Sequence, residues 1–228
     1  MPAMGEASVS VVIPALNEEG GVACALRSTR GAAEKIVVDG GSRDRTREIA
    51  EAEGALVLQS PPSRGLQLDT GARRASGDWL LFLHADSWLE PGWATAIQGL
   101  GPRDAGGAFR FAIDAPGRGY RLIEGAVALR CALFRLPYGD QALFVRRSAY
   151  ERLGGFAPIP LLEDVEFVRR LRREGGLAFP PRRAFTSPRR WERHGLWGTT
   201  LRNWSVLALY AAGFSPGRLA RLYQGSRT

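Results

Sequence analysis

Cysteine is scarce in this chain of 228 residues, which contains only two. Cys24 and Cys131 are far apart and form neither a Cys-x-x-Cys pair nor the spacing of a zinc site. The simplest interpretation is a protein of a reducing compartment. With 45% hydrophobic residues, a chain of this length can bury a sizeable core without disulfides or structural metal.

Long hydrophobic runs are missing as well. No stretch reaches the roughly 18 uninterrupted apolar residues of a membrane-spanning helix, and the nearest candidate, residues 204–214, is too short. The apolar run at residues 9–13 follows a short segment without the pattern of a signal peptide. We therefore expect a cytoplasmic protein, with peripheral attachment to the inner face of the membrane as an option.

Lysine is nearly absent, because Lys35 is the only one and arginine carries almost all of the positive charge. The net charge is +8. Arginine forms bidentate contacts with phosphate and carboxylate groups. The excess of arginine over acidic residues has two interpretations: a compositional bias towards arginine codons, or an anionic ligand or surface as the partner.

Apolar runs alternate with helical patterns in the first half of the chain. We expect strands at residues 9–14, 35–38, 55–59 and 79–83, and helices at residues 17–30, 46–53 and 66–75. This alternation predicts an α/β fold with a mostly parallel central sheet flanked by helices. In such sheets, ligands bind at the carboxyl ends of the strands.

The second half has a more irregular pattern. We expect strands at residues 106–113 and 141–145, helices at residues 120–134, 147–153 and 163–174, an extended segment at residues 178–185, and a helical tail at residues 198–223. We divide the chain into an α/β domain, residues 1–185, and a basic, aromatic helical extension, residues 186–228. The extension packs on the domain, or lies at a membrane or dimer surface.

Polar residues follow the first two expected strands. Pro14 is followed by Asn17 and Glu18, which either hold a nucleobase or ribose or cap the next helix. Asp39 ends the second strand, beside glycines that let the backbone approach a ligand closely. Asp44 accepts hydrogen bonds from the same ligand, or caps the helix that follows. A phosphate loop is excluded here, since its Gly-Lys-Ser/Thr ending is missing.

A diphosphate and a divalent metal are the ligands expected further along the sheet edge. Arg64 precedes a helix whose free N–H groups favour anions, although a solvated surface arginine is the alternative. His84 and Asp86 are alternate residues after the fourth strand and can face one point. Imidazole and carboxylate both bind Mn²⁺ or Mg²⁺, and a diphosphate would complete the shell. The alternative is a structural histidine and a turn aspartate.

Two adjacent acids, Glu163 and Asp164, follow a proline-rich loop. Either they supply a general base for an acceptor hydroxyl, or they are the acidic first turn of a helix. The spacing does not decide which of the two faces the site. In the basic segment at residues 186–195, Arg190 and His194 either contact phosphate or metal, or belong to a solvated loop.

The order of these motifs resembles that of family 2 glycosyltransferases, which have the GT-A fold. The matching segments are VVIPALNEE, VVDGGSRDRT, SRGLQ, GDWLLFLHAD, GDQALFVRR and LLEDVEF, and they extend over residues 9–173. The His-Ala-Asp triplet looks like that of a compact bacterial subgroup, whereas the wider family usually has Asp-x-Asp at this place. The resemblance therefore makes Asp86 the main metal ligand, with His84 where a carboxylate is common.

The resemblance also implies roles for single residues. Those of the nucleotide and donor site would be Pro14, Asn17, Glu18, Asp39, Arg64, Asp140 and Gln141. Asp164 would be the catalytic base. Mn²⁺ or Mg²⁺ would be the cofactor.

We predict an enzyme that transfers a sugar from a nucleotide-diphosphate donor to an acceptor hydroxyl. The expected reaction is a metal-dependent direct displacement that inverts the anomeric configuration. The acceptor class stays open between a lipid carrier, a glycan, a small metabolite and a peptide. Residues 196–223 mix Trp, Leu and Arg, which fits an interfacial helix on an anionic membrane and fits equally a helix packed on the domain or in a homodimer.

Two other classes compete with this prediction. A sugar nucleotidyltransferase would share the nucleotide-binding sheet and would release pyrophosphate, but no glycine-rich triphosphate loop is present. A non-enzymatic nucleic-acid-binding module is suggested by the net charge of +8 and by Trp191, Trp197 and Trp204. The scattered arginines and the acids at the strand ends argue against it, so we expect no nucleic-acid partner.

Overall fold

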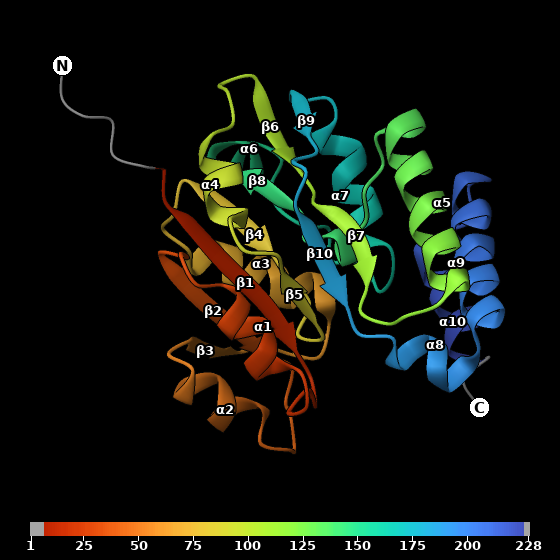
Figure 1. Ribbon diagram of the computed structural model, residues 1–228, viewed down its shortest axis with the longest axis horizontal. Coiled ribbons are helices and arrows are strands. Elements are labelled where there is room, and N and C mark those ends of the chain that lie inside the picture. The colour runs from red at the N-terminus through yellow and green to blue at the C-terminus, as the bar shows by residue number, and fades with distance from the viewer. Residues whose placement is uncertain (1–6, 226–228) are drawn as a thin grey trace.

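The computed structural model describes residues 7–225, apart from the side chains of His194 and residues 223–225. Seven strands form the central sheet: β1 (Val9–Ala15), β2 (Glu34–Asp39), β3 (Leu56–Gln59), β4 (Trp79–Phe82), β6 (Asp104–Gly107), β8 (Phe144–Arg146) and β9 (Gly176–Ala178). Their order is β3-β2-β1-β4-β8-β6-β9 (Figure 1). The pairs β3–β2, β2–β1, β1–β4 and β6–β9 are parallel, whereas β8 runs antiparallel to β4 and β6. The predicted α/β fold with a mostly parallel sheet is confirmed.

Both faces of the sheet are covered, and the alternation of side chains along β1 shows why. Val11 and Ile13 belong to one hydrophobic core and Val12 to the other, because successive side chains of a strand point to opposite faces. Four helices of the first half supply the cover: α1 (Val22–Ser28), α2 (Thr46–Ala52), α3 (Arg64–Arg74) and α4 (Trp93–Gln98). The side chains of Val11, Val12 and Ile13 are fully buried, which accounts for the three consecutive apolar residues in this strand.

The second half adds helices α5 (Arg118–Phe134), α6 (Arg147–Arg152) and α7 (Glu163–Leu171), and the 3-10 helix η1 (Gly139–Gln141). The chain ends with α8 (Arg189–His194), α9 (Leu196–Ala211) and α10 (Pro216–Gly225), which lie beside α5 at one end of the molecule (Figure 1). A small hydrophobic core joins this tail to α7, with Val206 and Leu219 packed against Leu162 and Val165. The tail is therefore attached to the element that carries the predicted catalytic acids.

One predicted strand, residues 106–113, is wrong, because the chain divides it between two sheets. β6 belongs to the central sheet, whereas β7 (Arg110–Ile113) joins β5 (Ser87–Leu89) and β10 (Arg183–Thr186) in a second sheet of order β5-β10-β7. At the crossing point, Phe109 is fully buried and its N–H donates to the carbonyl of Gln141. Tertiary packing at this residue therefore ends one strand before the next begins.

Two other predicted boundaries are also wrong, for reasons of local backbone geometry. Asn17 has a left-handed conformation with φ of 54°, so the helix predicted from this residue begins only at Val22. Ala142 has φ of 48°, and the strand predicted over residues 141–145 begins at Phe144. Asparagine tolerates the left-handed region better than most residues, which suits a tight turn at the end of β1.

Within the described residues, no helix is long and apolar enough to cross a membrane.

Candidate active site

Two cavities meet at the carboxyl ends of the parallel strands. The strand-end cavity, of about 400 Å³, is lined by residues that follow β1 and β4 and by residues of α3 and α8. The tail-side cavity, of about 340 Å³, lies between the start of α7 and the C-terminal helices. Arg64, His84 and Arg190 line both cavities, which places these three side chains where the two meet. The other predicted residues divide between them, with Pro14, Glu18 and Asp86 in the first, and Asp140, Glu163 and Asp164 in the second.

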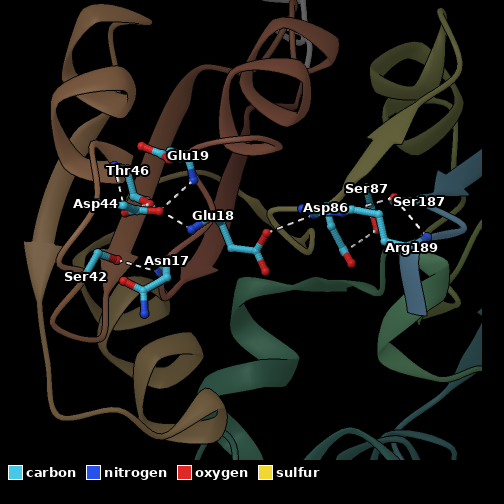
Figure 2. A network of polar contacts seen from close by, with 10 residues as sticks. All are labelled: Asn17, Glu18, Glu19, Ser42, Asp44, Thr46, Asp86, Ser87, Ser187 and Arg189. Atoms are coloured by element: carbon cyan, nitrogen blue, oxygen red, sulfur yellow. Dashed lines mark hydrogen bonds and ion pairs between the residues drawn. The ribbon is translucent and has the colours of Figure 1, made fainter. Parts of the chain in front are cut away.

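The loops after β1 and β2 are tied together by polar contacts (Figure 2). The N–H of Asn17 donates to Ser42 Oγ at 2.9 Å, and the N–H of Arg43 donates to Asn17 Oδ1 at 2.9 Å. The carboxylate of Asp44 accepts hydrogen bonds from the N–H groups of Glu19 and Thr46, both at 3.1 Å. Asn17 caps no helix, because α1 starts from Gly21 without a side-chain cap. Asn17 and Asp44 thus hold the two loops in one arrangement beside the cavity.

Asp39 lies beneath the loop that follows β2 and lines neither cavity. Its side chain is fully buried, and its carboxylate accepts hydrogen bonds from the N–H groups of Gly41 and Ser42, both at 3.0 Å. Gln67, which belongs to a quoted motif but was not predicted as a site residue, does line the strand-end cavity. Its amide donates to the carbonyls of Ala15 at 2.9 Å and Val38 at 2.8 Å, and so joins the ends of β1 and β2.

An ion pair between residues far apart in the sequence involves Glu18, which lines the strand-end cavity. Arg189 Nη2 lies 3.0 Å from Glu18 Oε2, and the carboxylate of Glu18 points towards Asp86 (Figure 2). Burial and the charge of Asp86 raise the pKa of Glu18, although Arg189 acts in the opposite direction. Sequence analysis missed Arg189, since no local pattern distinguishes it from the neighbouring arginines.

The turn that contains His84 and Asp86 is held against the start of α1. A Cβ atom on Gly21 would lie 2.6 Å from the carbonyl oxygen of Ala85, so only glycine allows this approach. Among the described side chains, the carboxylate of Asp86 accepts one long hydrogen bond, from Ser87 Oγ at 3.3 Å. Burial and the positive charge of Arg64 lower the pKa of His84 to about 4. The imidazole of His84 is therefore neutral at pH 7, with a nitrogen lone pair that a cation can use.

A divalent cation fits this turn only as part of a larger shell. Among the residues that the structure describes, no three His, Cys, Asp or Glu side chains form a metal-binding group. Asp86 supplies the hard oxygen that Mn²⁺ or Mg²⁺ prefers, and neutral His84 supplies a nitrogen. Mg²⁺ in particular is commonly bound through one or two carboxylates together with substrate phosphates. The donor set is thus compatible with a cation that a diphosphate helps to hold.

The two adjacent acids of α7 have different partners. Glu163 is almost fully buried and forms an ion pair with Arg64 Nε. Burial alone would lower the pKa of Arg64, but the carboxylates of Glu163 and Asp164 outweigh it and raise the pKa. Asp164 accepts hydrogen bonds from the backbone N–H groups of Gly139 at 2.7 Å and Val165 at 2.8 Å. Of the two acids, Glu163 forms the ion pair with Arg64, whereas Asp164 forms no ion pair with the side chains that the structure describes.

Gly139 allows Asp164 and His84 to approach the same point. A Cβ atom on Gly139 would lie 3.0 Å from Asp164 Oδ2 and 3.2 Å from His84 Nε2. The next residue, Asp140, has a buried Oδ1 atom without a hydrogen-bond partner, and burial raises its pKa although Arg130 opposes this. An unpaired buried oxygen is costly, so Asp140 Oδ1 is a place where a ligand donor would be accommodated.

Gln141 was predicted for the donor site, but the structure places it elsewhere. Its Oε1 accepts hydrogen bonds from Arg130 Nη2 at 2.9 Å and from the N–H of Tyr138 at 3.2 Å, and its Nε2 donates to the carbonyl of Phe109 at 3.1 Å. Gln141 lines neither cavity of the site. These contacts instead hold Tyr138, which sequence analysis missed and which lines the tail-side cavity.

The two residues predicted from the basic tail have different outcomes. Arg190 lines both cavities, as a contact to phosphate would require. The side chain of His194 lies outside the described residues, so its predicted contact to metal stays a prediction.

Comparisons with known proteins show what the chain resembles in sequence and fold. Residues 10–118 match the family model described as glycosyl transferase family 2. The PGL/p-HBAD biosynthesis glycosyltransferase of Mycobacterium tuberculosis is 29% identical over 160 residues, which are 64% of this chain and 62% of the relative. The chain thus spans about three fifths of the length of this relative.

Solved structures with a similar fold include glycosyltransferase relatives with bound ligands. Glucosyl-3-phosphoglycerate synthase from Mycobacterium tuberculosis, in complex with Mn²⁺, UDP and phosphoglyceric acid, has a TM-score of 0.60 at 23% identity, over 92% of this chain and 80% of that chain. TarS 1-349 of S. aureus has a TM-score of 0.61 at 14% identity, over 93% and 68% of the two chains. At these identities the structures establish the fold. The chain therefore has the GT-A fold, and its residues 10–118 match the glycosyl transferase family 2.

Proposed function

We propose that this protein transfers a sugar from a nucleotide-diphosphate donor to the hydroxyl group of an acceptor. The single observation that carries the proposal is the meeting of two cavities at Arg64, His84 and Arg190, with Asp86 in one and Asp164 in the other. A transferase needs two adjoining substrate sites, with cations where the diphosphate leaves and a base where the hydroxyl enters.

The strand-end cavity is the proposed donor site. Pro14, Asn17, Glu18 and the loop supported by Asp39 and Asp44 would bind the nucleoside, and Arg64 and Arg190 would contact the diphosphate. Asp86, with His84 beside it, would hold Mn²⁺ or Mg²⁺, as would His194 if its side chain reaches the ion. When bound, the cation would neutralise charge on the diphosphate and so make it a better leaving group.

The tail-side cavity is the proposed acceptor site. Asp164 accepts the proton of the acceptor hydroxyl, whose oxygen then forms a bond to the anomeric carbon of the donor sugar. The bond between that carbon and the diphosphate oxygen breaks in the same displacement, and the nucleoside diphosphate leaves with the bonding electrons. Attack opposite the leaving group inverts the anomeric configuration. Glu163 contributes by fixing Arg64, Asp140 lies in the loop beside the two sugars, and Gln141 contributes by holding Tyr138 of that loop.

The experiment that tests this function is a screen of nucleoside diphosphates and nucleotide sugars by thermal shift, with and without Mn²⁺. Ligands that bind the folded protein raise its melting temperature, and we expect a metal-dependent rise. Asp86→Ala should abolish the metal-dependent part, whereas Asp114→Ala should not, because Asp114 lines neither cavity. No shift with any ligand would contradict the proposal. Release of pyrophosphate from a nucleoside triphosphate would indicate a sugar nucleotidyltransferase instead.

We further propose that residues 1–185 are the catalytic domain and that residues 186–228 are an extension with a second role, peripheral contact with an anionic membrane from the cytoplasmic side. On α9, Trp197, Leu201 and Trp204 lie on one face and are 58%, 56% and 48% exposed. Residues 186–225 contain six arginines and a single acid, Glu192. Exposed tryptophans beside arginines are typical of interfacial helices.

Sedimentation with vesicles tests the membrane contact. We expect binding to phosphatidylglycerol vesicles, little binding to phosphatidylcholine, and loss of binding in Trp197→Ser/Trp204→Ser. The membrane contact would be contradicted if the protein bound neither kind of vesicle and light scattering gave twice the mass of the chain. This result would indicate a homodimer instead.

A further inference from the structure

The tail-side cavity has two ends of opposite character. The end near α3 and β4 carries the charged residues, with Asp164 and Asp140 among them. The other end is an apolar wall that consists of Pro160, Leu161, Leu162, Val206, Leu207 and Ala220. Asn203 is the polar residue that α9 adds to the lining. A sugar or a short polyol would contact the charged end alone and would leave the apolar wall against water.

The apolar wall is a firm part of the fold. It is built by the loop before α7, by α9 and by α10, and Leu162, Val206 and Ala220 are each less than 10% exposed. Leu162 and Val206 belong to the same hydrophobic cluster as Leu219, which is fully buried. Because these residues are packed from behind, the wall does not depend on a ligand to keep its shape.

The backbone at Leu162 is strained in a way that joins the wall to the catalytic acid. Leu162 has φ of 64° and ψ of 26°, a left-handed conformation that bulky residues rarely adopt. It immediately precedes Glu163 and Asp164 at the start of α7. Strain of this kind persists where the surrounding structure fixes it, and it is concentrated at functional sites. One turn therefore places an apolar side chain in the wall and a carboxylate at the charged end.

The charged end also contains an unpaired hydrogen-bond acceptor. Asp140 Oδ1 is buried without a partner, and a buried acceptor is rarely left unpaired in a native protein. The ring of Tyr138 is held nearby under the guanidinium of Arg130, whose carbon lies 3.6 Å from the ring centre. A hydroxyl-bearing ligand would donate to Asp140 at one end of the cavity while its remaining part lies along the wall.

We propose that the acceptor is an amphipathic alcohol, a compound that presents a hydroxyl group to Asp164 and lays an alkyl or aryl body against the apolar wall. The inference rests on the proposed function, because it assigns the acceptor of that same site. It gives the C-terminal helices a specific task, since α9 and α10 supply half of the wall. Free sugars and polar peptides are excluded as the preferred acceptors.

The test measures binding of n-alkyl β-D-glucosides with methyl, butyl, hexyl and octyl chains, each below its micelle concentration. Calorimetry is done in the presence of Mn²⁺ and the nucleoside diphosphate that gives the largest thermal shift. We expect the dissociation constant to fall by up to about fourfold for each methylene group that the wall covers. Extending the series to dodecyl distinguishes two sources of this chemistry: gains that stop at hexyl or octyl indicate a small alcohol, and gains that continue indicate a lipid.

Variants identify the wall as the place of binding. Leu207→Gln changes polarity at similar volume and should remove most of the dependence on chain length, whereas Leu207→Met should retain it. Ala220→Leu fills the cavity and should weaken binding of the octyl compound more than that of the methyl compound. Leu222→Gln is the matched control, since Leu222 is 62% exposed on α10 and lines neither cavity.

The outcomes separate this inference from the function on which it rests. Equal dissociation constants for methyl and octyl glucoside, with normal thermal shifts for the nucleotide, would overturn the amphipathic acceptor and leave the transferase intact. Chain-length dependence that survives both Leu207→Gln and Ala220→Leu would also overturn it. The absence of any nucleotide shift would instead overturn the transferase itself.

Discussion

The two cavities differ in how far apart in the sequence their lining residues lie. Most of the strand-end cavity comes from turns that directly follow β1 and β4, within residues 14–86. The tail-side cavity gathers residues from seven separated segments, which range from Arg64 to Ala220. The first is determined by where buried strands end. The second depends on how α7, α9 and α10 pack, so its chemistry becomes visible only in three dimensions.

In the proposed function, the strand-end cavity binds the donor and Asp164 in the tail-side cavity accepts the proton. Asp164→Asn tests this division most strongly. A positioned general base contributes roughly 10²- to 10⁴-fold, so we expect sugar transfer to fall by about 10³-fold. The nucleotide-dependent thermal shift should be unchanged, because Asp164 lines only the tail-side cavity. Transfer rates are measured from release of nucleoside diphosphate. Near-normal rates would show that another group is the base.

A stability comparison contrasts the sheet with the exposed tail. Leu81 is fully buried in β4, whereas Leu201 on α9 is 56% exposed. Leu81→Ala removes core contacts and leaves a cavity, so the free energy of unfolding should fall by roughly 2–5 kcal/mol. Leu201→Ala should change it by less than about 0.5 kcal/mol. Both values come from urea unfolding. A large loss in Leu201→Ala would mean that this face of α9 is covered, as in a dimer.

Gly139→Ala addresses the point where the two cavities meet. The added Cβ would lie 3.0 Å from Asp164 Oδ2 and 3.2 Å from His84 Nε2, so both side chains must move by a few tenths of an ångström. Misplaced catalytic groups lower rates steeply, and we expect kcat to fall by about 10- to 100-fold.

The matched control for this variant is Gly198→Ala in α9, where a Cβ would meet no atom within 4 Å. It should leave kcat unchanged and stabilise the helix slightly. Equal kcat values for Gly139→Ala and the unaltered protein would show that the approach of Asp164 and His84 has no catalytic importance.

The smallest expected effect concerns the ion pair that links the two regions, Glu18 with Arg189. Their side chains are 29% and 54% exposed, so the pair contributes less than about 1 kcal/mol to folding. Arg189→Gln should weaken nucleoside diphosphate binding by only about threefold, equivalent to less than 1 kcal/mol. Calorimetric titration measures this, with Arg193→Gln as the control. A loss above 30-fold would show that Arg189 itself contacts the diphosphate.

Much of the first region could be predicted from the sequence, because its signals are local. The apolar run of β1 predicts a buried parallel strand. The helical patterns that follow it, each ended by glycine, predict the crossover helices. Pro14, Glu18 and Asp86 line the strand-end cavity as expected, since residues that follow neighbouring parallel strands share one edge of the sheet. The motifs did not show which side chains hold the backbone in place: Asp39 does so beneath the site, and Gln67 does so from the lining of the cavity.

The second region was harder to predict, because the contacts that position its residues join segments far apart in the sequence. Residues 106–113 have one continuous apolar pattern, yet burial of Phe109 divides them between two sheets. Gln141 belongs to a recognisable motif, but Arg130 and Phe109 take up its amide. Neither outcome follows from hydrophobic periodicity, because this pattern describes one segment and not the elements that pack against it.

The sequence by itself determined the order of strands and helices in the first half, the resemblance to family 2 glycosyltransferases, and the placement of Asp86 at a strand end. Only the tertiary structure gave Glu163 and Asp164 different partners, because Arg64, which pairs with Glu163, stands 99 residues away. It also brought Arg190 and the C-terminal helices to the same site. The physical reason is that hydrophobic periodicity encodes which face a residue buries, whereas the partner of a buried charge is set by packing between elements.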